Sequence, residues 1–310
     1  MSYFLGVDGG QSSTLALIGD GEGRVIGRGV AGPCNHVGAA EGRVKFLAAL
    51  RDSVGAARKQ AGLPDALEFA AACLGFSGGP QDKDILTREV LRAEQYTIVD
   101  DAFIALSGAL GGEPGAVAIA GTGSIAYARN RKGETARAGG WGYVFGDAGG
   151  AFDITRQALR AALRFEEGWG PATELHRSLL ATCQAKTAND LLHRFYTSEF
   201  SRPAIAGYAS LVDEAAHAGD AEAVRILRHA AQDLATIANA VCLRLFGKED
   251  VAVAYVGGVF QSSLLLDEFR QRVENRVVTP RFAPAAGALL EAYRAAGRSS
   301  LIPHSLNGDF

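Results

Sequence analysis

The sequence has few cysteines and no long apolar run, and each scarcity excludes a class of protein. Its four cysteines lie far apart and form no C-x-x-C pair: Cys34, Cys73, Cys183 and Cys242. They therefore predict neither a zinc knuckle nor the disulfide framework of a small secreted domain. No apolar run reaches membrane-spanning length and no charged-then-apolar leader opens the chain, so we expect a cytoplasmic protein without a membrane partner.

An excess of charge of one sign is also lacking. With 31 Lys and Arg against 34 Asp and Glu, the formal net charge is −3, which gives no electrostatic bias toward nucleic acid. Glycine, by contrast, is plentiful at 39 residues, and many glycines stand in pairs at predicted strand ends. This distribution predicts backbone loops shaped around a ligand, in a chain of 310 residues that is long enough for two domains.

Two stretches share one pattern of strand, glycine turn, strand, polar turn and strand. The first covers residues 3–29 and contains "DGGQSST", and the second covers 115–140 and contains "GTGS". The match lies in the pattern and not in residue identity, so we interpret it as an internal duplication that produces two α/β domains of one topology. The boundary is expected near residue 108, where no Pro/Ser-rich linker occurs.

Helical periodicity is clearest in two segments. Over residues 41–61 it places Val44, Leu47, Val54 and Ala57 on one apolar face. Over residues 220–246 a core-facing stripe ends at a glycine. Between these segments, short buried strands are predicted at 69–74 and 96–99, and they run into "GFSGGP" and "DDA".

The two glycine turns are the first candidates for chemistry. A phosphate chain needs backbone N–H donors that can approach closely, and glycine-rich turns supply them. A tight hairpin also needs glycine, so either turn alone is weak evidence, but two in matching places predict a clamp on a nucleoside triphosphate. Asp8 stands beside the first turn and would repel phosphate without a cation, so we assign it to Mg²⁺. Its alternative role is an Asx-type turn cap.

Acids at a strand end are the next candidates. "VDDA" places Asp100 and Asp101 at the carboxyl edge of a strand, where open α/β sheets usually collect ligands. We expect Asp100 to cap the helix that follows. Asp101 is expected to accept the proton of an attacking hydroxyl, as the general base of kinase phosphoryl transfer does.

Two loops carry further polar groups. Asp147 follows the glycine-flanked Trp141, and it is expected either to accept hydrogen bonds from sugar hydroxyls or to cap the helix that begins near Ala151. In "GPCNH", Asn35 offers both a donor and an acceptor to a hydroxyl or amide ligand. His36 is more typical of a structural or surface histidine than of a catalyst.

The order of these motifs resembles a known group of proteins. "GVDGG", the "NH" after the first meander, "GFSGG", "DDA", "GTGS", "GGWG…GDAGG" and "VGGVFQS" occur in the order seen in the N-acetylglucosamine kinase and BadF/BcrA-type ATPase group. That group belongs to the sugar kinase/actin/Hsp70 superfamily. The resemblance spans nearly the whole chain, and the block from GGWG to GDAGG is its most specific part.

The resemblance implies a fold and a ligand set. The fold would be two ribonuclease-H-like domains, as in actin-like ATPases, with ATP and Mg²⁺ in the cleft between them and an amino sugar beyond the γ-phosphate. The N-terminal domain would cover residues 1–107, completed by the last helix at about 288–310, and the C-terminal domain would cover 108–287. A homodimer is expected from the family alone.

The resemblance also implies roles for individual positions. The ATP contacts would come from Gly9, Gly10, Gln11, Ser12, Gly121, Thr122, Gly123, Ser124, Gly257 and Gly258. The sugar contacts would come from Asn35, His36, Gly78, Asp101, Gly140, Trp141 and Asp147. Asp8 would serve the metal, and Asp101 would be the base that activates the 6-hydroxyl of N-acetylglucosamine or glucosamine.

Two positions depart from the group. The first acid is Asp8, where some relatives carry Glu, and a water-bridged metal tolerates either residue. The residues after Asp101 are Ala-Phe rather than the small pairs associated with animal N-acetylglucosamine kinases. Contacts to an N-acyl group are therefore open, and the sequence does not rank N-acetylglucosamine, glucosamine and other hexoses.

Two rival functions follow from the same group. One is an ATP-driven activator of a radical dehydratase, which holds an iron–sulfur cluster with closely placed cysteines; the scattered cysteines disfavour it. The other is a nucleotide-switched regulatory protein on a kinase scaffold, because fold alone does not establish chemistry. The presence of both Asp101 and Asp147 favours retained catalysis over this second rival.

Overall fold

The computed structural model describes residues 1–34, 40–78, 83–197 and 200–305, and the chain forms two compact units. Unit 1 combines Met1–Gly115 with Thr279–Phe310, and unit 2 is Ala116–Val278. The chain thus passes from unit 1 to unit 2 later than the expected boundary at 107, and it returns earlier than 288. The reason is that a helix of unit 1, α3 (Asp101–Leu110), continues across residue 107.

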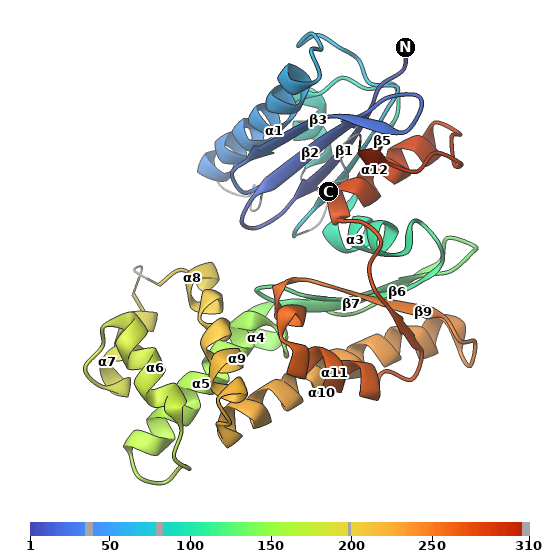
Figure 1. The fold of residues 1–310 in the computed structure, drawn as a ribbon. Helices are drawn as coiled ribbons and strands as arrows, with labels where there is room; N and C mark the ends of the chain where they lie inside the picture. The colour runs from blue at the N-terminus through green and yellow to red at the C-terminus, as the bar shows by residue number, and fades with distance from the viewer. Residues whose placement is uncertain (35–39, 79–82, 198–199, 306–310) are drawn as a thin grey trace. The chain divides into compact units, whose positions relative to one another are not determined.

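Unit 1 is built on a six-stranded sheet of order β11-β3-β2-β1-β4-β5 (Figure 1). The first three strands form an antiparallel meander, and β4 and β5 continue the sheet in parallel with β1. The strands are β1 (Phe4–Gly9), β2 (Thr14–Gly19), β3 (Arg24–Ala31), β4 (Ala71–Phe76), β5 (Tyr96–Asp100) and β11 (His304–Ser305). Because β1, β4 and β5 run in parallel, their carboxyl ends lie at the same edge of the sheet.

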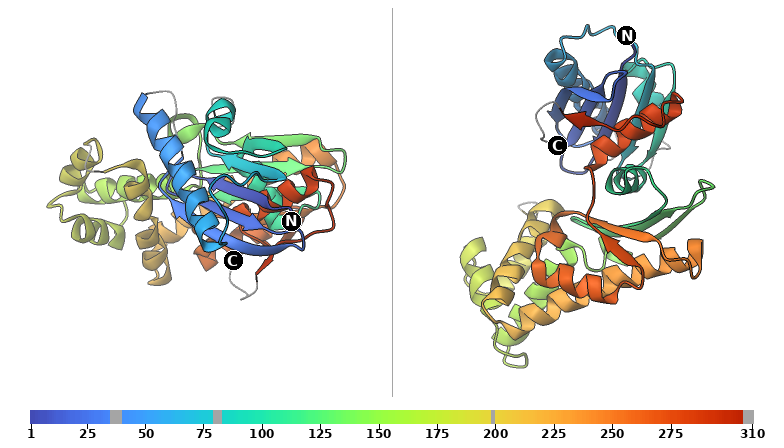
Figure 2. Two further views of the ribbon diagram at one scale, coloured as in Figure 1. Left: turned by 90° about the horizontal axis from the view of Figure 1, so that it is seen from above. Right: turned by 45° about the vertical axis from the view of Figure 1, so that its right-hand side comes forward.

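Helices cover both faces of this sheet (Figures 1 and 2). α1 (Ala40–Gln60) packs on the face that carries Leu5 and Val7, whereas α12 (Pro284–Ala295) packs on the face that carries Phe4. The alternation of neighbouring side chains between two cores is the period-two pattern of a strand that is buried on both sides. The other helices of the unit are α2 (Asp84–Val90) and α3.

The predicted helix near residues 41–61 is present, but its buried face differs from the expected one. Phe46, Leu50, Val54 and Ala57 are buried at spacings of three and four residues. Val44 is 67% exposed, so its assignment to the core is wrong. Two residues along a helix turn it by about 200°, which places Val44 nearly opposite Phe46.

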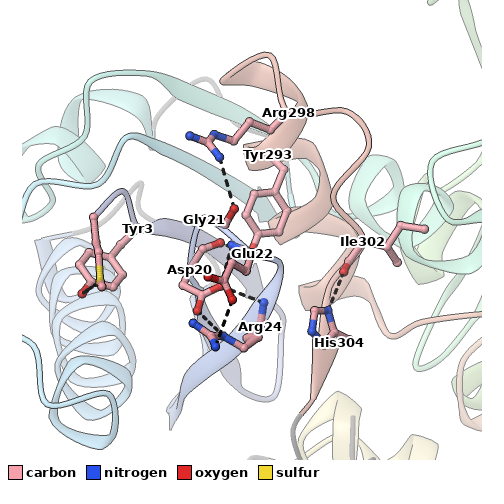
Figure 3. A network of polar contacts seen from close by, with 10 residues as sticks. Tyr3, Asp20, Gly21, Glu22, Arg24, Tyr293, Arg298, Ile302 and His304 are labelled. Atoms are coloured by element: carbon pink, nitrogen blue, oxygen red, sulfur yellow. Dashed lines mark hydrogen bonds and ion pairs between the residues drawn. The ribbon is translucent and has the colours of Figure 1, made fainter.

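The C-terminal segment is tied to the first hairpin of the chain. The hydroxyl of Tyr293 on α12 donates a hydrogen bond to the carbonyl of Asp20 over 3.0 Å, and Arg298 donates one to the carbonyl of Gly21 over 3.3 Å (Figure 3). Gly6 lets α12 approach β1, because a Cβ at Gly6 would collide with the backbone of Leu289. The last helix therefore completes the hydrophobic core of the first domain.

Unit 2 repeats the same sheet with new strands. Its order is β10-β9-β6-β7-β8, and β9 pairs in parallel with both β6 and β10. This is the order of β5-β4-β1-β2-β3 in unit 1, so the predicted duplication and the expected class of two ribonuclease-H-like α/β units are confirmed. The strands are β6 (Gly115–Ala120), β7 (Ser124–Arg129), β8 (Thr135–Gly139), β9 (Ala252–Val256) and β10 (Arg276–Val278).

The chain between β8 and β9 is helical, as expected. The predicted long helix is α10 (Ala221–Phe246), which begins where the side chain of Asp220 accepts the N–H of Ala223 over 2.9 Å and ends at Gly247. The other helical elements are α4 (Gly142–Phe145), α5 (Ala151–Glu166), α6 (Glu174–Cys183), α7 (Ala188–Phe195), α8 (Arg202–Gly207), α9 (Ala209–His217), η1 (Gly258–Gln261) and α11 (Ser263–Arg272). Within the described ranges, the helices are all too short or too polar to cross a bilayer.

Candidate active site

Two carboxylates meet at the carboxyl edge of the sheet in unit 1. Asp8 is the fifth residue of β1, and Asp101 is the first residue of α3, directly after β5. Burial raises the pKa of Asp8 to about 7, and the nearby charge of Asp101 adds to the increase. The fold therefore brings together two partly exposed acids that are distant in the sequence, and their surroundings disfavour the ionised form of Asp8.

The groups around Asp101 act on its pKa in both directions. Burial raises its pKa, and so does the charge of Asp100, whereas hydrogen bonds from the Ala102 N–H and from Ser77 lower it, as does the charge of Lys83. A carboxylate with a raised pKa and partners that orient it has the properties of a general base. Asp100 stands at the N-cap of α3 as expected, but its side chain makes no capping hydrogen bond.

The surroundings of Asp8 fit a divalent cation that arrives with a phosphate ligand. Among the described residues, no group of three or more His, Cys, Asp or Glu is placed to hold a metal ion. Mg²⁺ does not need such a group, because it commonly binds through one or two carboxylates together with water and substrate phosphates. A cation at Asp8 would relieve the burial and the like-charge repulsion that raise its pKa.

The first glycine turn lies next to these acids. It is closed by a hydrogen bond from the Gly10 N–H to the Ser13 carbonyl over 2.9 Å, while Gln11 and Ser12 are exposed. The side chain of Gln11 donates to the hydroxyl of Ser77 over 3.2 Å. Gly9 ends β1 against the ring of Phe76, where a Cβ would collide with that ring.

Two residues of this site were not among the sequence candidates. Ser77 is 7% exposed and follows β4, and its N–H donates to the Gly9 carbonyl over 3.0 Å. Lys83 is 3% exposed, and its ammonium group donates to the Ser77 carbonyl over 2.5 Å and lies 5.6 Å from the ring centroid of Phe76. Ser77 lies within the "GFSGG" motif, which was a usable signal, but no local pattern marks Lys83.

Of the remaining residues of unit 1 that were expected to contact the sugar, the structure describes Gly78 alone. Gly78 is exposed in a left-handed conformation (φ 81°), and a Cβ there would lie 3.8 Å from the Lys83 ammonium nitrogen. It is thus adjacent to Ser77 and close to Lys83. Asn35 and His36 lie outside the described residues.

The second glycine turn has its own support within unit 2. The Gly121 N–H donates to the Gly123 carbonyl over 3.0 Å. The first N–H groups of α5, those of Ala151 and Phe152, donate to the carbonyls of Gly121 and Thr122 over 2.8 and 3.1 Å. The start of α5 is therefore fixed against the turn by two of its backbone N–H groups.

The glycine pair after β9 lies beside this second turn. Gly257 has a φ of 114°, and a Cβ on it would collide with the backbone of Ala120 and Gly121. Gly258 is exposed at the start of η1, and a Cβ there would meet no atom within 4 Å. The two glycines thus have unequal roles: the first allows close packing, and the second leaves an open surface.

Asp147 lies against the same turn with a partner that the sequence did not reveal. It is 6% exposed, adopts a left-handed conformation (φ 60°), and accepts a hydrogen bond from the Ser124 N–H over 3.4 Å. Its other carboxylate oxygen forms an ion pair with Arg202, the first residue of α8. Gly150, not Asp147, stands at the N-cap of α5, so the capping alternative is wrong.

Aromatic rings surround this ion pair and the loop before it. The guanidinium carbon of Arg202 lies 5.1 Å from the ring centroid of Tyr143. Trp141 is exposed, and the guanidinium of Arg137 lies 5.0 Å from its ring centroid. The preceding Gly140 donates its N–H to the Ser124 carbonyl over 2.9 Å. Unit 2 therefore brings Gly121, Ser124, Gly140 and Asp147 together, with an exposed indole beside them.

Comparison with known proteins gives a consistent result. The family model described as BadF/BadG/BcrA/BcrD ATPase family matches residues 5–292. The chain is 33% identical over 279 residues to the N-acetylmuramic acid/N-acetylglucosamine kinase of Clostridium acetobutylicum, which covers 87% of this chain and 90% of the relative. It is 30% identical over 310 residues to the N-acetyl-D-glucosamine kinase of Dictyostelium discoideum, covering 93% and 97% of the two chains.

A solved structure agrees in fold. A Chromobacterium violaceum protein, described provisionally as an N-acetylglucosamine kinase, superposes with a TM-score of 0.78 at 29% sequence identity. The match covers 94% of this chain and 98% of that one. Nearly the whole length of both proteins is therefore equivalent.

Proposed function

Because the chain belongs to the BadF/BadG/BcrA/BcrD ATPase family, we propose that it is an ATP-dependent kinase that phosphorylates the 6-hydroxyl of an amino sugar, N-acetylglucosamine or glucosamine. The observation that carries the proposal is the pair of acids Asp8 and Asp101 at one sheet edge of unit 1. One acid serves the metal and the other serves the acceptor hydroxyl, which is the division of roles that phosphoryl transfer needs.

Asp101 is the proposed general base. Hydrogen bonds from the Ala102 N–H and from Ser77 lower its pKa and so favour the ionised form, which can accept a proton. The raised pKa makes it a better proton acceptor than an ordinary aspartate near neutral pH. It would take the proton of the 6-hydroxyl as the oxygen attacks the γ-phosphorus and ADP leaves.

Asp8 is the proposed metal residue. Mg²⁺ bound with ATP would neutralise charge on the transferring phosphoryl group. The like charge of Asp101 makes a bare carboxylate at Asp8 unfavourable, and this supports the assignment. Gly9, Gly10, Gln11 and Ser12 of the first glycine turn in unit 1 would lie against the phosphates.

Unit 2 supplies the remaining proposed contacts. Gly121, Thr122, Gly123 and Ser124 of the second glycine turn would lie against the phosphates, and Gly257 and Gly258 would lie beside the nucleoside. Gly140, Trp141 and Asp147 would contact the sugar, together with Asn35, His36, Gly78 and Asp101 of unit 1. An exposed indole ring suits the apolar face of a sugar, which supports the assignment of Trp141. A cytoplasmic location and a homodimer stay predictions.

A substrate panel tests the proposal. ADP release is measured with ATP, Mg²⁺ and each of N-acetylglucosamine, glucosamine, N-acetylmuramic acid and glucose, and phosphorus NMR identifies the product. We expect saturable stimulation by an amino sugar and a sugar 6-phosphate as product. Asp101→Asn should lower kcat by about 10²- to 10⁴-fold and leave ATP affinity unchanged, because the base acts only on the acceptor.

The negative outcomes are equally specific. ADP release that is the same with every sugar and without sugar would contradict the kinase assignment and favour the activator or regulatory alternatives. Normal turnover in Asp101→Asn would show that another group takes the proton.

A further inference from the structure

A cavity of about 320 Å³ lies in unit 1 between α1, the segment that follows this helix and the end of α2. α1 lines it with residues at spacings of three and four, which share one face of the helix: Arg51, Val54, Gly55 and Arg58. Pockets that hold small molecules measure about 300–1,000 Å³, so this one has room for a small ligand. None of the described residues that line it was assigned to ATP, the metal or the sugar.

Arg58 is a buried cation without an ion-pair partner in the part of the chain that the structure describes. It is 8% exposed, and its Nη2 donates to the Leu67 carbonyl over 2.9 Å. The ring centroid of Phe69 lies 5.1 Å from its guanidinium carbon. Burial lowers the pKa of Arg58, and the charge of the exposed Asp65 raises it. A buried charge is costly unless an anion lies close, so the positive charge of Arg58 is left to compensate.

Two nitrogens of the Arg58 guanidinium have hydrogen-bond donors to spare. Nε is buried and makes no hydrogen bond within the described ranges. Nη1 makes none there either, but unlike Nε it is not enclosed. Because Arg58 lines the cavity, a ligand that enters can meet Nη1. The guanidinium can only donate, so the ligand group that meets it must be an acceptor, and an anion would also balance the charge.

The other walls of the cavity limit the chemistry of this anion. Its aliphatic residues are buried or half-buried: Leu50, Val54, Val90 and Leu91. The other charged residues that line it are Arg51 and Asp65, both exposed, so two arginines against one aspartate leave a single positive charge. A single charge suits a carboxylate better than a phosphate ester, which carries about −1.5 to −2 near neutral pH. The aliphatic wall suits an apolar chain attached to that carboxylate.

We propose that this cavity binds a small carboxylate with a short aliphatic chain. The carboxylate accepts from Arg58, and the chain lies against the aliphatic wall. Hydrogen bonds between a guanidinium and a carboxylate are charge-assisted and therefore stronger than neutral ones. A purely structural alternative is that Arg58 only ties α1 to the segment after it, through the Leu67 carbonyl and the Phe69 ring. The two differ in whether the cavity prefers a carboxylate to a neutral molecule of the same shape.

Titration of the full chain with hexanoate tests the proposal, with hexanamide as the neutral counterpart. Binding is followed by the methyl NMR signals of the aliphatic wall: Leu50, Val54, Val90 and Leu91. We expect hexanoate to shift them saturably and hexanamide to bind about 10- to 100-fold more weakly, as for a lost hydrogen bond to a charged group. The measurement needs neither ATP nor sugar, so its outcome is independent of the proposed kinase activity.

Two variants and one control locate the binding. Gly55→Leu should fill the cavity and abolish the shifts, because Gly55 lines it and a Cβ there meets no atom within 4 Å. Arg58→Met removes the charge but keeps a flexible apolar chain beside Phe69, so hexanoate should bind this variant no more tightly than hexanamide binds wild type. Ala48→Leu, an exposed change on the same helix, should bind hexanoate like wild type.

Three outcomes would overturn the proposal. Equal affinities for hexanoate and hexanamide would mean that Arg58 does not recognise the charge. Shifts that persist in Gly55→Leu would place the binding elsewhere. An absence of saturable shifts in wild type would show that the cavity takes no such ligand. If Arg58→Met fails to fold, the comparison with hexanamide and the Gly55→Leu variant still decide.

Discussion

The first glycine turn of each unit follows a strand with the same burial pattern, but the two turns have different chemical settings. β1 and β6 have the same alternation of buried and partly exposed residues, and a backbone hydrogen bond of 2.9 or 3.0 Å closes each turn that follows. The fifth residue is partly exposed in both strands, yet it is Asp8 in one and Ile119 in the other. The duplicated scaffold therefore supplies two similar turns, and only one has a carboxylate beside it.

The acids of the two units also differ in how their charge is compensated. The charge of Asp101 helps to raise the pKa of Asp8, and Lys83, the cation whose charge lowers the pKa of Asp101, also bonds to the Ser77 carbonyl. Asp147 of unit 2 has Arg202 as a direct counter-ion. A site that must receive Mg²⁺ gains from uncompensated negative charge, whereas a residue that only accepts hydroxyl hydrogen bonds does not need it. The difference suits the roles proposed for the two units.

The largest expected effect on the free energy of unfolding comes from Asp8→Asn, which removes the charge that β1 has and β6 lacks. The folded-state pKa of Asp8 is about 7, above the ordinary value of 3.8, so the folded state binds the proton more tightly than the unfolded state. The free energy of unfolding should therefore fall as pH rises from about 4 to about 7. Each pKa unit corresponds to about 1.4 kcal/mol, which makes about 4 kcal/mol an upper bound.

Denaturant unfolding of Asp8→Asn without ligand measures this effect. The variant should be more stable than wild type at pH 8 and equal to it near pH 4. It should also lose most of the stabilisation that Mg²⁺ and ATP give to wild type. Asp52→Asn, an exposed change on α1, is the control and should follow wild type at both pH values. A variant that is no more stable than wild type at pH 8 would show that the ionised Asp8 carboxylate does not destabilise the folded state.

The strand meanders could be predicted from sequence because their causes are local. Glycine turns between apolar runs, and caps such as Asp220 and Gly247, lie next to the elements that they delimit. The error at Val44 has a different cause, since the side of α1 that faces the core depends on the sheet on which it packs. Periodicity alone predicted a face through Val44, and tertiary packing buried the one through Phe46 and Leu50 instead.

The second prediction compares two adjacent glycines of unit 2. Gly257→Ala places a Cβ against the backbone of Ala120, at a position whose φ is 114°. Relieving the collision would require the backbone of β6 or of residue 257 to shift. We expect a loss of about 3 kcal/mol in the free energy of unfolding and weaker ATP binding. Gly258→Ala meets open space and should unfold like wild type, so any effect on ATP affinity there would come from contact with the nucleotide. Equal stabilities of the two variants would contradict this account.

The parts of the site that sequence reasoning missed share a physical feature. Ser77 and Arg202 matter through partners that only the fold brings near: Ser77 is 66 residues from Gln11, and Arg202 is 55 residues from Asp147. No local spacing reports such contacts. Glycines and acids at strand ends could be recognised because their positions in the chain already indicate a sheet edge.

The smallest expected effect tests the neutralised acid of unit 2. Arg202→Ala leaves the buried Asp147 carboxylate without its counter-ion, although the partial exposure of Arg202 limits the cost. We expect a loss of about 1–2 kcal/mol in unfolding free energy, below that of a fully buried pair, and a higher KM for sugar with KM for ATP unchanged. The matched control is Arg177→Ala, whose partner Glu174 lies 2.7 Å away on the surface, with an expected loss below about 0.5 kcal/mol. Equal losses in the two variants would mean that Asp147 is as well hydrated as a surface acid, and the contrast between the two units would then rest on Asp8 and Asp101 alone.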